Sequence, residues 1–377
     1  MGTRPAGRKV PQRVWLPLAA GVGLLAGLWI PWSGRPGCAP NSVQVDFDAS
    51  TAPGDAFDWT LLPKAAFPIP PFTRYLDGVT IVLDPGHGGR GDVPNYKRGP
   101  TGLREAEVNL RVALFLREFL EQAGARVSLT REDDVYLDPD NGADLTRRAE
   151  IANRAAADLL LSIHHNASDN EDANYTAVFY HGNPEHSPAS LDAGRQLLIA
   201  LQDALRLESQ LPTALLSDYA MYPGKGFRVL REAHVPAILA ESSFHSNPAE
   251  EQRLRRPLYN RREAYGMFLG LARWAQGGLP RVRLVRAASS PRGGAELRVQ
   301  LDDGLRSRGG WGSDLPSVSA SSLIVRLDGR DTPFDWEPGK REITLPLPRN
   351  WSAPGVLYVD FTNRFGQHVL HPRLAIE

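Results

Sequence analysis

The chain has 377 residues, enough for two folded domains and a further segment. Its 42% hydrophobic and 23% charged residues exclude a protein that is disordered throughout. Lys plus Arg equals Asp plus Glu at 43 each, so the chain lacks the excess of basic residues typical of nucleic-acid binding, and no nucleic-acid partner is expected. The single cysteine, Cys38, excludes a disulfide framework and a cysteine-rich metal site.

Residues 1–38 are predicted to be an export signal or a membrane anchor. Four basic residues precede an apolar run from Val14 to Trp32, which is about long enough to cross a bilayer. Basic residues on that side favour a cytoplasmic N-terminus and export of everything that follows. Because the run is long for a cleaved signal peptide, an inner-membrane anchor at residues 14–32 is favoured. The rest of the chain is expected in the periplasm or cell envelope.

Residues 39–75 are rich in Pro, Ala, Asp and Ser, and this composition predicts an extended linker or strap. Residues 76–277 then alternate between strand and helix patterns. The strands are expected at 79–84, 126–130, 158–163, 175–180 and 236–241. The helices are expected from near Glu105 to Gly124, at 149–157, around Leu191 to Leu205, and up to about Trp274. This order predicts an α/β domain with a mostly parallel sheet covered by helices on both faces.

Two further segments of the chain have a distinct pattern. Residues 280–377 contain only short alternating runs separated by Gly, Pro, Asn and Asp, which predicts a C-terminal antiparallel β-sandwich. Five arginines before and within the last helix are predicted to lie on a solvated helix face: Arg253, Arg255, Arg256, Arg261 and Arg262.

Reactive side chains follow several of the expected strands. In an open parallel sheet, ligands bind beyond the carboxyl ends of the strands. His87 follows the first strand in the turn "DPGHGG", His164 follows the third in "SIHHNAS", and Glu241 ends the strand "PAILAE". Glu105 opens the helix after the first strand and is expected to point back toward the same edge. Two histidines and one carboxylate form the ligand set of a catalytic zinc, and a further carboxylate can act as the base.

Each of these residues has a plainer explanation when it is taken alone. His87 could be incidental to a tight turn, Glu105 could be an acid favoured by the helix dipole, and Glu241 could be a surface carboxylate. Four such coincidences at one edge of a sheet are much less probable than one, so a shared site is favoured. His165 is adjacent to His164, so either histidine could be the one that faces the metal. Neighbours on a strand point to opposite faces, so only one can do so, and the position favours His164.

Four segments closely resemble the zinc-dependent N-acetylmuramoyl-L-alanine amidases with an α/β catalytic domain: "IVLDPGHGG", "GLREAEVNL", "RRAEIANRAAADLLLSIHHNAS" and "HVPAILAESSFHSNPAEEQRL". They occur in the family's order over about half of the chain. The resemblance implies Zn²⁺ as cofactor, metal ligands at His87, Glu105 and His164, and a catalytic glutamate at Glu241. It also implies peptidoglycan as the partner and cleavage of the amide bond between N-acetylmuramic acid and the L-alanine of the stem peptide.

Three other kinds of function are compatible with parts of the sequence. Another zinc peptidase acting on cell-wall peptides would share the metal site, and only its products would differ. A non-catalytic wall-binding module would be expected to have lost a ligand or Glu241, and none is lost. Ser242 and Ser243 lie close to His245, but no Gly-x-Ser-x-Gly elbow supports a serine hydrolase. A protein activator and the role of the C-terminal domain are left open.

Overall fold

The computed structural model describes residues 67–93, 96–184, 186–209, 214–289, 295–305, 318–348 and 351–377. The predicted signal or anchor and most of the predicted linker lie outside these residues. No helix in the described ranges has both the length and the apolar composition needed to cross a bilayer.

A six-stranded sheet forms the centre of the first domain, in the order β2-β1-β3-β6-β4-β5. Four neighbouring strands are parallel: β2 (Arg126–Leu129), β1 (Thr80–Pro85), β3 (Leu159–Asn166) and β6 (Ala237–Phe244). The last two strands, β4 (Ala177–Tyr180) and β5 (Leu215–Ser217), run the opposite way, because β4 pairs with β6 in the antiparallel sense. The predicted mostly parallel sheet is confirmed, although the sequence did not indicate the three-residue strand β5 or the reversal of β4.

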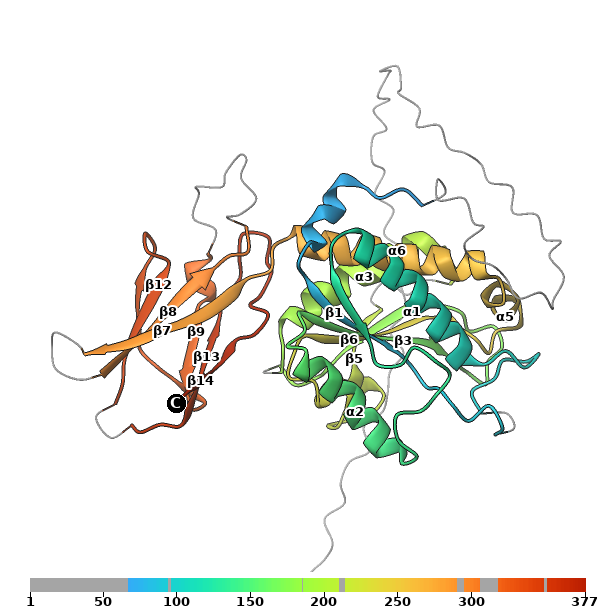
Figure 1. The fold of residues 1–377 in the computed structure, drawn as a ribbon, viewed down its shortest axis with the longest axis horizontal. Coiled ribbons are helices and arrows are strands. Elements are labelled where there is room, and N and C mark those ends of the chain that lie inside the picture. The colour runs from blue at the N-terminus through green and yellow to red at the C-terminus, as the bar shows by residue number, and fades with distance from the viewer. Residues whose placement is uncertain are drawn as a thin grey trace, which may run out of the picture. The chain divides into compact units, whose positions relative to one another are not determined.

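Helices cover both faces of this sheet, as predicted (Figure 1). One face carries three long helices, α1 (Glu105–Gln122), α3 (Ala189–Leu205) and α6 (Pro257–Gln276), and α6 contacts both of the others. The other carries α2 (Asn141–Arg154) and the short α4 (Arg228–Arg231). Helix α2 begins eight residues before the predicted start at 149, because Asp140 caps it by accepting a hydrogen bond from Ala143 N (2.7 Å).

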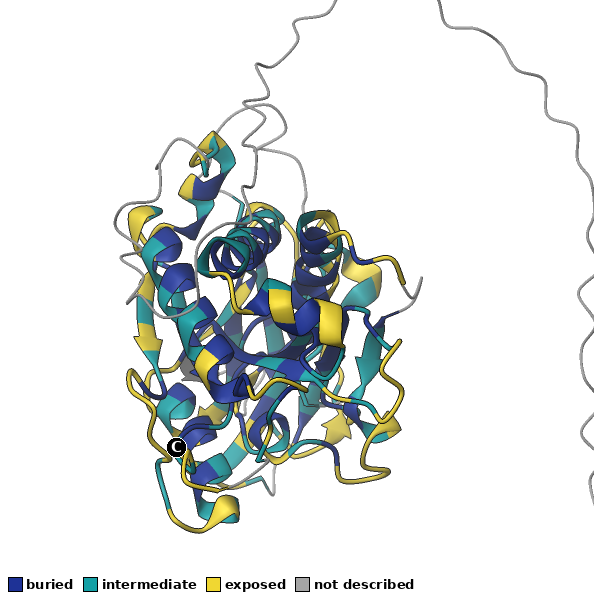
Figure 2. Ribbon diagram, turned by 90° about the vertical axis from the view of Figure 1, so that its right-hand side faces the viewer, coloured by how far each residue is buried: buried dark blue, intermediate teal, exposed yellow. Residues whose placement is uncertain are grey.

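The core of this domain lies between the sheet and its helices, where buried residues are concentrated (Figure 2). Strand β3 illustrates this burial: its residues 159–163 are apolar except for Ser162 and are all fully buried. A strand covered on both faces needs such a continuous apolar run, whereas a half-exposed strand would alternate.

The second domain consists of two four-stranded antiparallel sheets, which confirms the predicted β-sandwich. One sheet has the order β11-β12-β8-β7, formed by Asp335–Glu337, Glu342–Pro346, Ala295–Asp302 and Arg281–Ser289. The other has the order β10-β9-β13-β14, formed by Arg330–Asp331, Ile324–Leu327, Gly355–Asp360 and Arg373–Ile376. Side chains from both sheets share one hydrophobic core that includes Leu297, Val299, Leu345, Leu357 and Val359.

The described end of the predicted linker packs on the first domain. Residues Pro71–Leu76 form the 3-10 helix η3, which contacts α6. Ahead of it, the Phe67 ring lies 5.9 Å from that of Phe119 and 5.3 Å from that of Tyr265. The hydroxyl of Tyr265 donates to Pro68 O at 2.7 Å.

Arg261 corrects the prediction that five arginines form a solvated face. Its side chain is buried, donates two hydrogen bonds of 2.8 Å to Glu118, and lies over the rings of Phe67 and Phe119 at 5.7 and 4.8 Å. The residues that contact Arg261 come from α1 and from the segment before η3. The helical pattern of α6 alone therefore gave no indication of them.

We expect Arg261→Ala to lower the free energy of unfolding by about 2–3 kcal/mol, because it removes both the stacking of the guanidinium and its two charge-assisted hydrogen bonds. Urea unfolding followed by circular dichroism measures this. The matched control is Arg262→Ala on the same helix, expected to change stability by less than about 0.5 kcal/mol. Equal effects of the two substitutions would contradict this role for Arg261.

Candidate metal centre and active site

One cavity, of about 330 Å³, is lined by all four residues that the sequence singled out. It lies on the face of the sheet that carries α2 and α4, and residues of both helices line it. The side chains of His87, Glu105, His164 and Glu241 reach it from three strands or strand ends and from one helix.

His164 and Glu241 are brought together by strand register. Strand β3 extends to Asn166, so His164 lies within it rather than after it, directly opposite Glu241 of β6. Residues paired across two strands project from the same face of a sheet, a few ångströms apart. His165 projects from the other face, toward α1 and α6, as the alternation of strand residues predicted.

His87 is presented by a tight turn directly after β1. Its φ of 59° lies in the left-handed region, which is uncommon for a residue with a side chain. Gly86 must be a glycine because a Cβ at this position would lie 2.1 Å from Cε1 of His164. The backbone of the turn therefore passes against the imidazole of His164, and the two histidine rings lie 4.8 Å apart.

Two buried arginines hold this turn in place. Arg148 of α2 donates to His87 O at 2.7 Å and to Pro85 O at 3.0 Å, and Arg131 donates to Gly86 O at 3.0 Å. Arg148 also pairs with Asp84 at 2.8 Å. Burial by itself would raise the pKa of Asp84, but Arg148 and two hydroxyl donors outweigh it and hold that pKa below its usual value.

Glu105 is the first residue of α1, which lies on the opposite face of the sheet, and its side chain reaches both histidines. Its Oε2 lies 3.0 Å from His87 Nε2, and its Oε1 lies 3.0 Å from His164 Nδ1. The carboxyl is buried, which would raise its pKa, but the two imidazoles hold the pKa well below the usual value. Burial lowers the pKa of His164, which favours the neutral form of its ring.

These three residues form a group that could hold a metal ion. One ligand atom from each of His87, Glu105 and His164 lies within 4.8 Å of the other two. It is the one such group of histidine, cysteine and acidic residues found across the described residues. Two imidazoles and a carboxylate match the donor set of a catalytic zinc site.

Glu241 lies beside this group and differs from it electrostatically. Burial and the charge of Glu105 raise its pKa well above the usual value. Its Oε2 is buried and has no hydrogen-bond partner among the described residues. A carboxyl group whose oxygen is not engaged by the protein can take part in proton transfer with a reactant.

Other residues that line the cavity were not predicted from the sequence. They include three tyrosines and three cations: Tyr96, Tyr136, Tyr222, Arg90, Lys97 and Arg228. Most come from loops, where the sequence carries no periodic pattern to mark them. No serine is found among the described residues that line the cavity, and Ser242 and Ser243 are fully buried, so the serine-hydrolase alternative gains no support.

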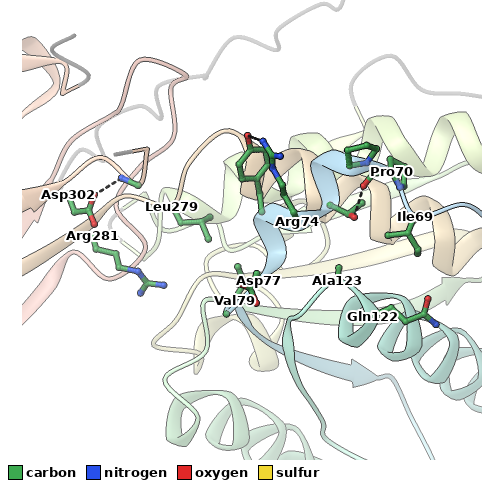
Figure 3. A pocket seen from close by; sticks show the side chains of 15 residues that line it. Ile69, Pro70, Arg74, Asp77, Val79, Gln122, Ala123, Leu279, Arg281 and Asp302 are labelled. Atoms are coloured by element: carbon green, nitrogen blue, oxygen red, sulfur yellow. Dashed lines mark hydrogen bonds between the residues drawn. The ribbon is translucent and has the colours of Figure 1, made fainter. Parts of the chain in front are cut away.

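A second cavity, of about 950 Å³, lies among η3, the end of α1 and the first strands of the sandwich (Figure 3). Its charged lining residues are Arg74, Asp77, Arg281 and Asp302. It is larger than the first, but its lining within the described part of the chain includes no histidine, cysteine or glutamate. The group of two histidines and two glutamates that the sequence singled out therefore lies at the smaller cavity.

Comparison with known proteins identifies the class. The family model described as N-acetylmuramoyl-L-alanine amidase matches residues 81–273, which is more than half of the chain. The chain belongs to this family, and it is an enzyme, an amidase of the hydrolase class.

Individual relatives of the chain are also named as amidases. The chain is 30% identical over 212 residues to the germination-specific N-acetylmuramoyl-L-alanine amidase of Bacillus subtilis, covering 54% of this chain and 83% of the relative. It is 33% identical over 185 residues to the probable cell wall amidase LytH of Staphylococcus aureus, covering 49% of this chain and 54% of that protein. The solved structure of the CwlD amidase from Clostridioides difficile, in complex with the GerS lipoprotein, is 25% identical in sequence. The match covers 52% of this chain and 98% of that one, with a TM-score of 0.44.

We expect Gly86→Ala to abolish tight binding of Zn²⁺, because the new methyl group would displace the ring of His164, one of the three candidate ligands. Isothermal titration of the metal-free protein measures this. Gly91→Ala in the same loop is the control, since its Cβ would approach only the flexible end of Arg104, at 3.2 Å. Unchanged zinc binding by Gly86→Ala would show that the turn does not need this close approach.

Proposed function

We propose that this chain hydrolyses the amide bond between the lactyl group of N-acetylmuramic acid and the L-alanine of the stem peptide in peptidoglycan. The single observation that carries the proposal is the group formed by His87, Glu105 and His164, with Glu241 beside it, in a chain of the N-acetylmuramoyl-L-alanine amidase family. The relatives described above are named as amidases of this bond or of the cell wall.

We further propose that the metal is zinc and that His87, Glu105 and His164 hold it. Calcium and magnesium prefer all-oxygen sites, so the two imidazoles favour zinc. Metal ligands must be deprotonated, and the lowered pKa values of Glu105 and His164 favour the deprotonated forms. Bound there, zinc would supply a Lewis acid that polarises the scissile carbonyl and lowers the pKa of a water molecule.

Glu241 is the proposed catalytic residue. Its unpartnered Oε2 is available to take a proton from the attacking water and to return it to the leaving amine. A raised pKa suits both halves of this task, because a group that accepts and then donates a proton works best when its pKa is near the working pH. Its place in β6, opposite His164 in register, holds the carboxyl on a rigid element.

The rim of the cavity suits a glycopeptide substrate. Tyr136 and Tyr222 are 45% and 55% exposed, and such rings offer apolar faces against which sugar rings can pack. Arg90, Lys97 and Arg228 provide cations for the carboxylates of a muropeptide.

We propose that the enzyme works in the cell envelope, in line with the relative named as a cell wall amidase. The inner-membrane anchor predicted at residues 14–32 lies outside the described residues and stays a prediction, as do the domain boundaries and a protein activator.

We expect the purified protein to release stem peptides with an intact N-terminal L-alanine and to leave glycan strands with free lactyl carboxyl groups. Mass spectrometry of digested peptidoglycan identifies both products. Another zinc peptidase would instead leave L-alanine on the glycan and shorten the peptide. That product pattern would overturn the proposed bond while the metal site stands, and a wild-type protein that releases neither product would overturn the catalytic role.

We expect Glu241→Gln to keep about one zinc per chain and the normal fold, while the rate falls by a factor of about a hundred or more. The substitution keeps the shape of the side chain but removes its proton acceptor. Elemental analysis and the rate of peptide release measure the two effects, and Glu105→Gln is the matched variant, expected to lose zinc as well. Loss of zinc from folded Glu241→Gln would make this residue a ligand instead of the base.

A further inference from the structure

A row of buried polar side chains lies behind Glu105, on the face of the sheet away from the cavity. It runs from Asn109 of α1 through His165 of β3 to Glu263 of α6. His165 and Glu263 are completely buried at their side chains, and Asn109 has no exposed surface. The reaction proposed above uses none of the three, although burying them carries a free-energy cost.

The orientation of the Asn109 amide follows from what surrounds it. Its nitrogen lies 3.2 Å from Gly86 O and 3.3 Å from Glu105 Oε1. Both neighbours only accept hydrogen bonds, so the NH₂ group must face them. The amide oxygen must therefore face His165, whose Nδ1 lies 2.8 Å away and donates to it.

The protonation of His165 follows in turn. Nδ1 carries a hydrogen because it faces the Asn109 oxygen, and Nε2 lies 3.2 Å from the Glu263 carboxylate. The ring is thus held at both nitrogens and cannot rotate without losing a buried hydrogen bond, which is costly. Glu263 fixes the ring, and the ring fixes the amide of Asn109.

The amide in turn fixes the carboxylate of Glu105. Two donors meet its Oε1, the backbone N of His165 at 3.2 Å and Asn109 Nδ2 at 3.3 Å, and His164 Nδ1 lies 3.0 Å from the same oxygen. The other oxygen, Oε2, faces His87 Nε2 at 3.0 Å. The two carboxylate oxygens of Glu105 therefore have different partners, and these partners together fix the orientation of the carboxylate plane.

We propose that Glu263, His165 and Asn109 form a positioning relay that orients the carboxylate of Glu105 and thereby sets the metal affinity of the site. This inference rests on the metal site proposed above. Hydrogen-bonded groups behind a metal ligand commonly change affinity by 10- to 100-fold when they are removed. Here the relay connects the ligand on α1 to α6, so it ties the start of one helix to the middle of another.

The covalent geometry of two amide side chains provides a matched test. The side-chain nitrogen of Asn is separated from Cβ by the same number of bonds as Nδ1 of His. The side-chain nitrogen of Gln is separated from Cβ by the same number of bonds as Nε2 of His. In a Glu263→Gln background, which removes the buried charge but can still hydrogen-bond the ring, His165→Asn keeps a donor toward Asn109. His165→Gln keeps a donor only toward position 263.

Zinc affinity is measured on the full chain by competition with a chromophoric chelator, and unfolding of the metal-free protein is measured in parallel. We expect Glu263→Gln alone and with His165→Asn to bind zinc within about threefold of wild type. We expect Glu263→Gln with His165→Gln to bind it about 10- to 100-fold more weakly. Equal affinities in the two double variants, strong or weak, would overturn the relay and leave His165 a packing residue.

Asn109→Leu is the second variant, in case the double variants do not fold. It keeps the branched shape of the side chain but removes the donor to Glu105. We expect zinc affinity to fall by about tenfold or more. The metal-free protein should unfold at a somewhat lower denaturant concentration, because His165 Nδ1 loses its buried acceptor, so the affinities are compared where the variant is folded. Wild-type affinity in this variant would overturn the inference alone, whereas a wild-type protein that takes up no zinc would overturn the proposed site and the relay together.

Discussion

The buried carboxylate of Glu105 is the group on which the rest of the site depends. An ionised carboxyl in the interior costs several kcal/mol unless it is paired and hydrogen-bonded. Here the compensation comes from both sides of the sheet, from the imidazoles of His87 and His164 on one side and from Asn109 and the backbone of His165 on the other. The start of α1, the turn after β1 and the end of β3 must therefore be in place at the same time.

This requirement explains why the turn after β1 is held so closely. Its backbone passes against the ring of His164, where only glycine fits at position 86, and the residue that follows has a left-handed conformation. Such backbone conformations persist only where the surroundings impose them. Arg131 and Arg148 do so by donating to successive carbonyl groups of the turn, and Asp84 balances the charge of Arg148.

The two glutamates of the site have opposite electrostatic environments, and this separates their proposed tasks. Glu105 lies against two imidazoles and has a lowered pKa, whereas Glu241 lies against the charge of Glu105 and has a raised one. Titratable groups whose pKa values are driven apart in one site are typical of an acid–base residue next to a charge-stabilised one. The family assignment gives the reaction class, and this asymmetry indicates which carboxyl would bind metal and which would move the proton.

The sequence by itself determined the α/β class, the β-sandwich and the four residues that meet in the cavity. Strand and helix periods and positions at strand ends are local, and parallel strands bring their carboxyl ends to one edge. Only the tertiary structure decided the reversal of β4, the burial of Arg261 and the relay behind Glu105. Arg261 meets Glu118 from 143 positions away, and His165 meets Glu263 from 98. A local pattern reports which face a side chain occupies, but the partner on that face depends on how distant elements pack.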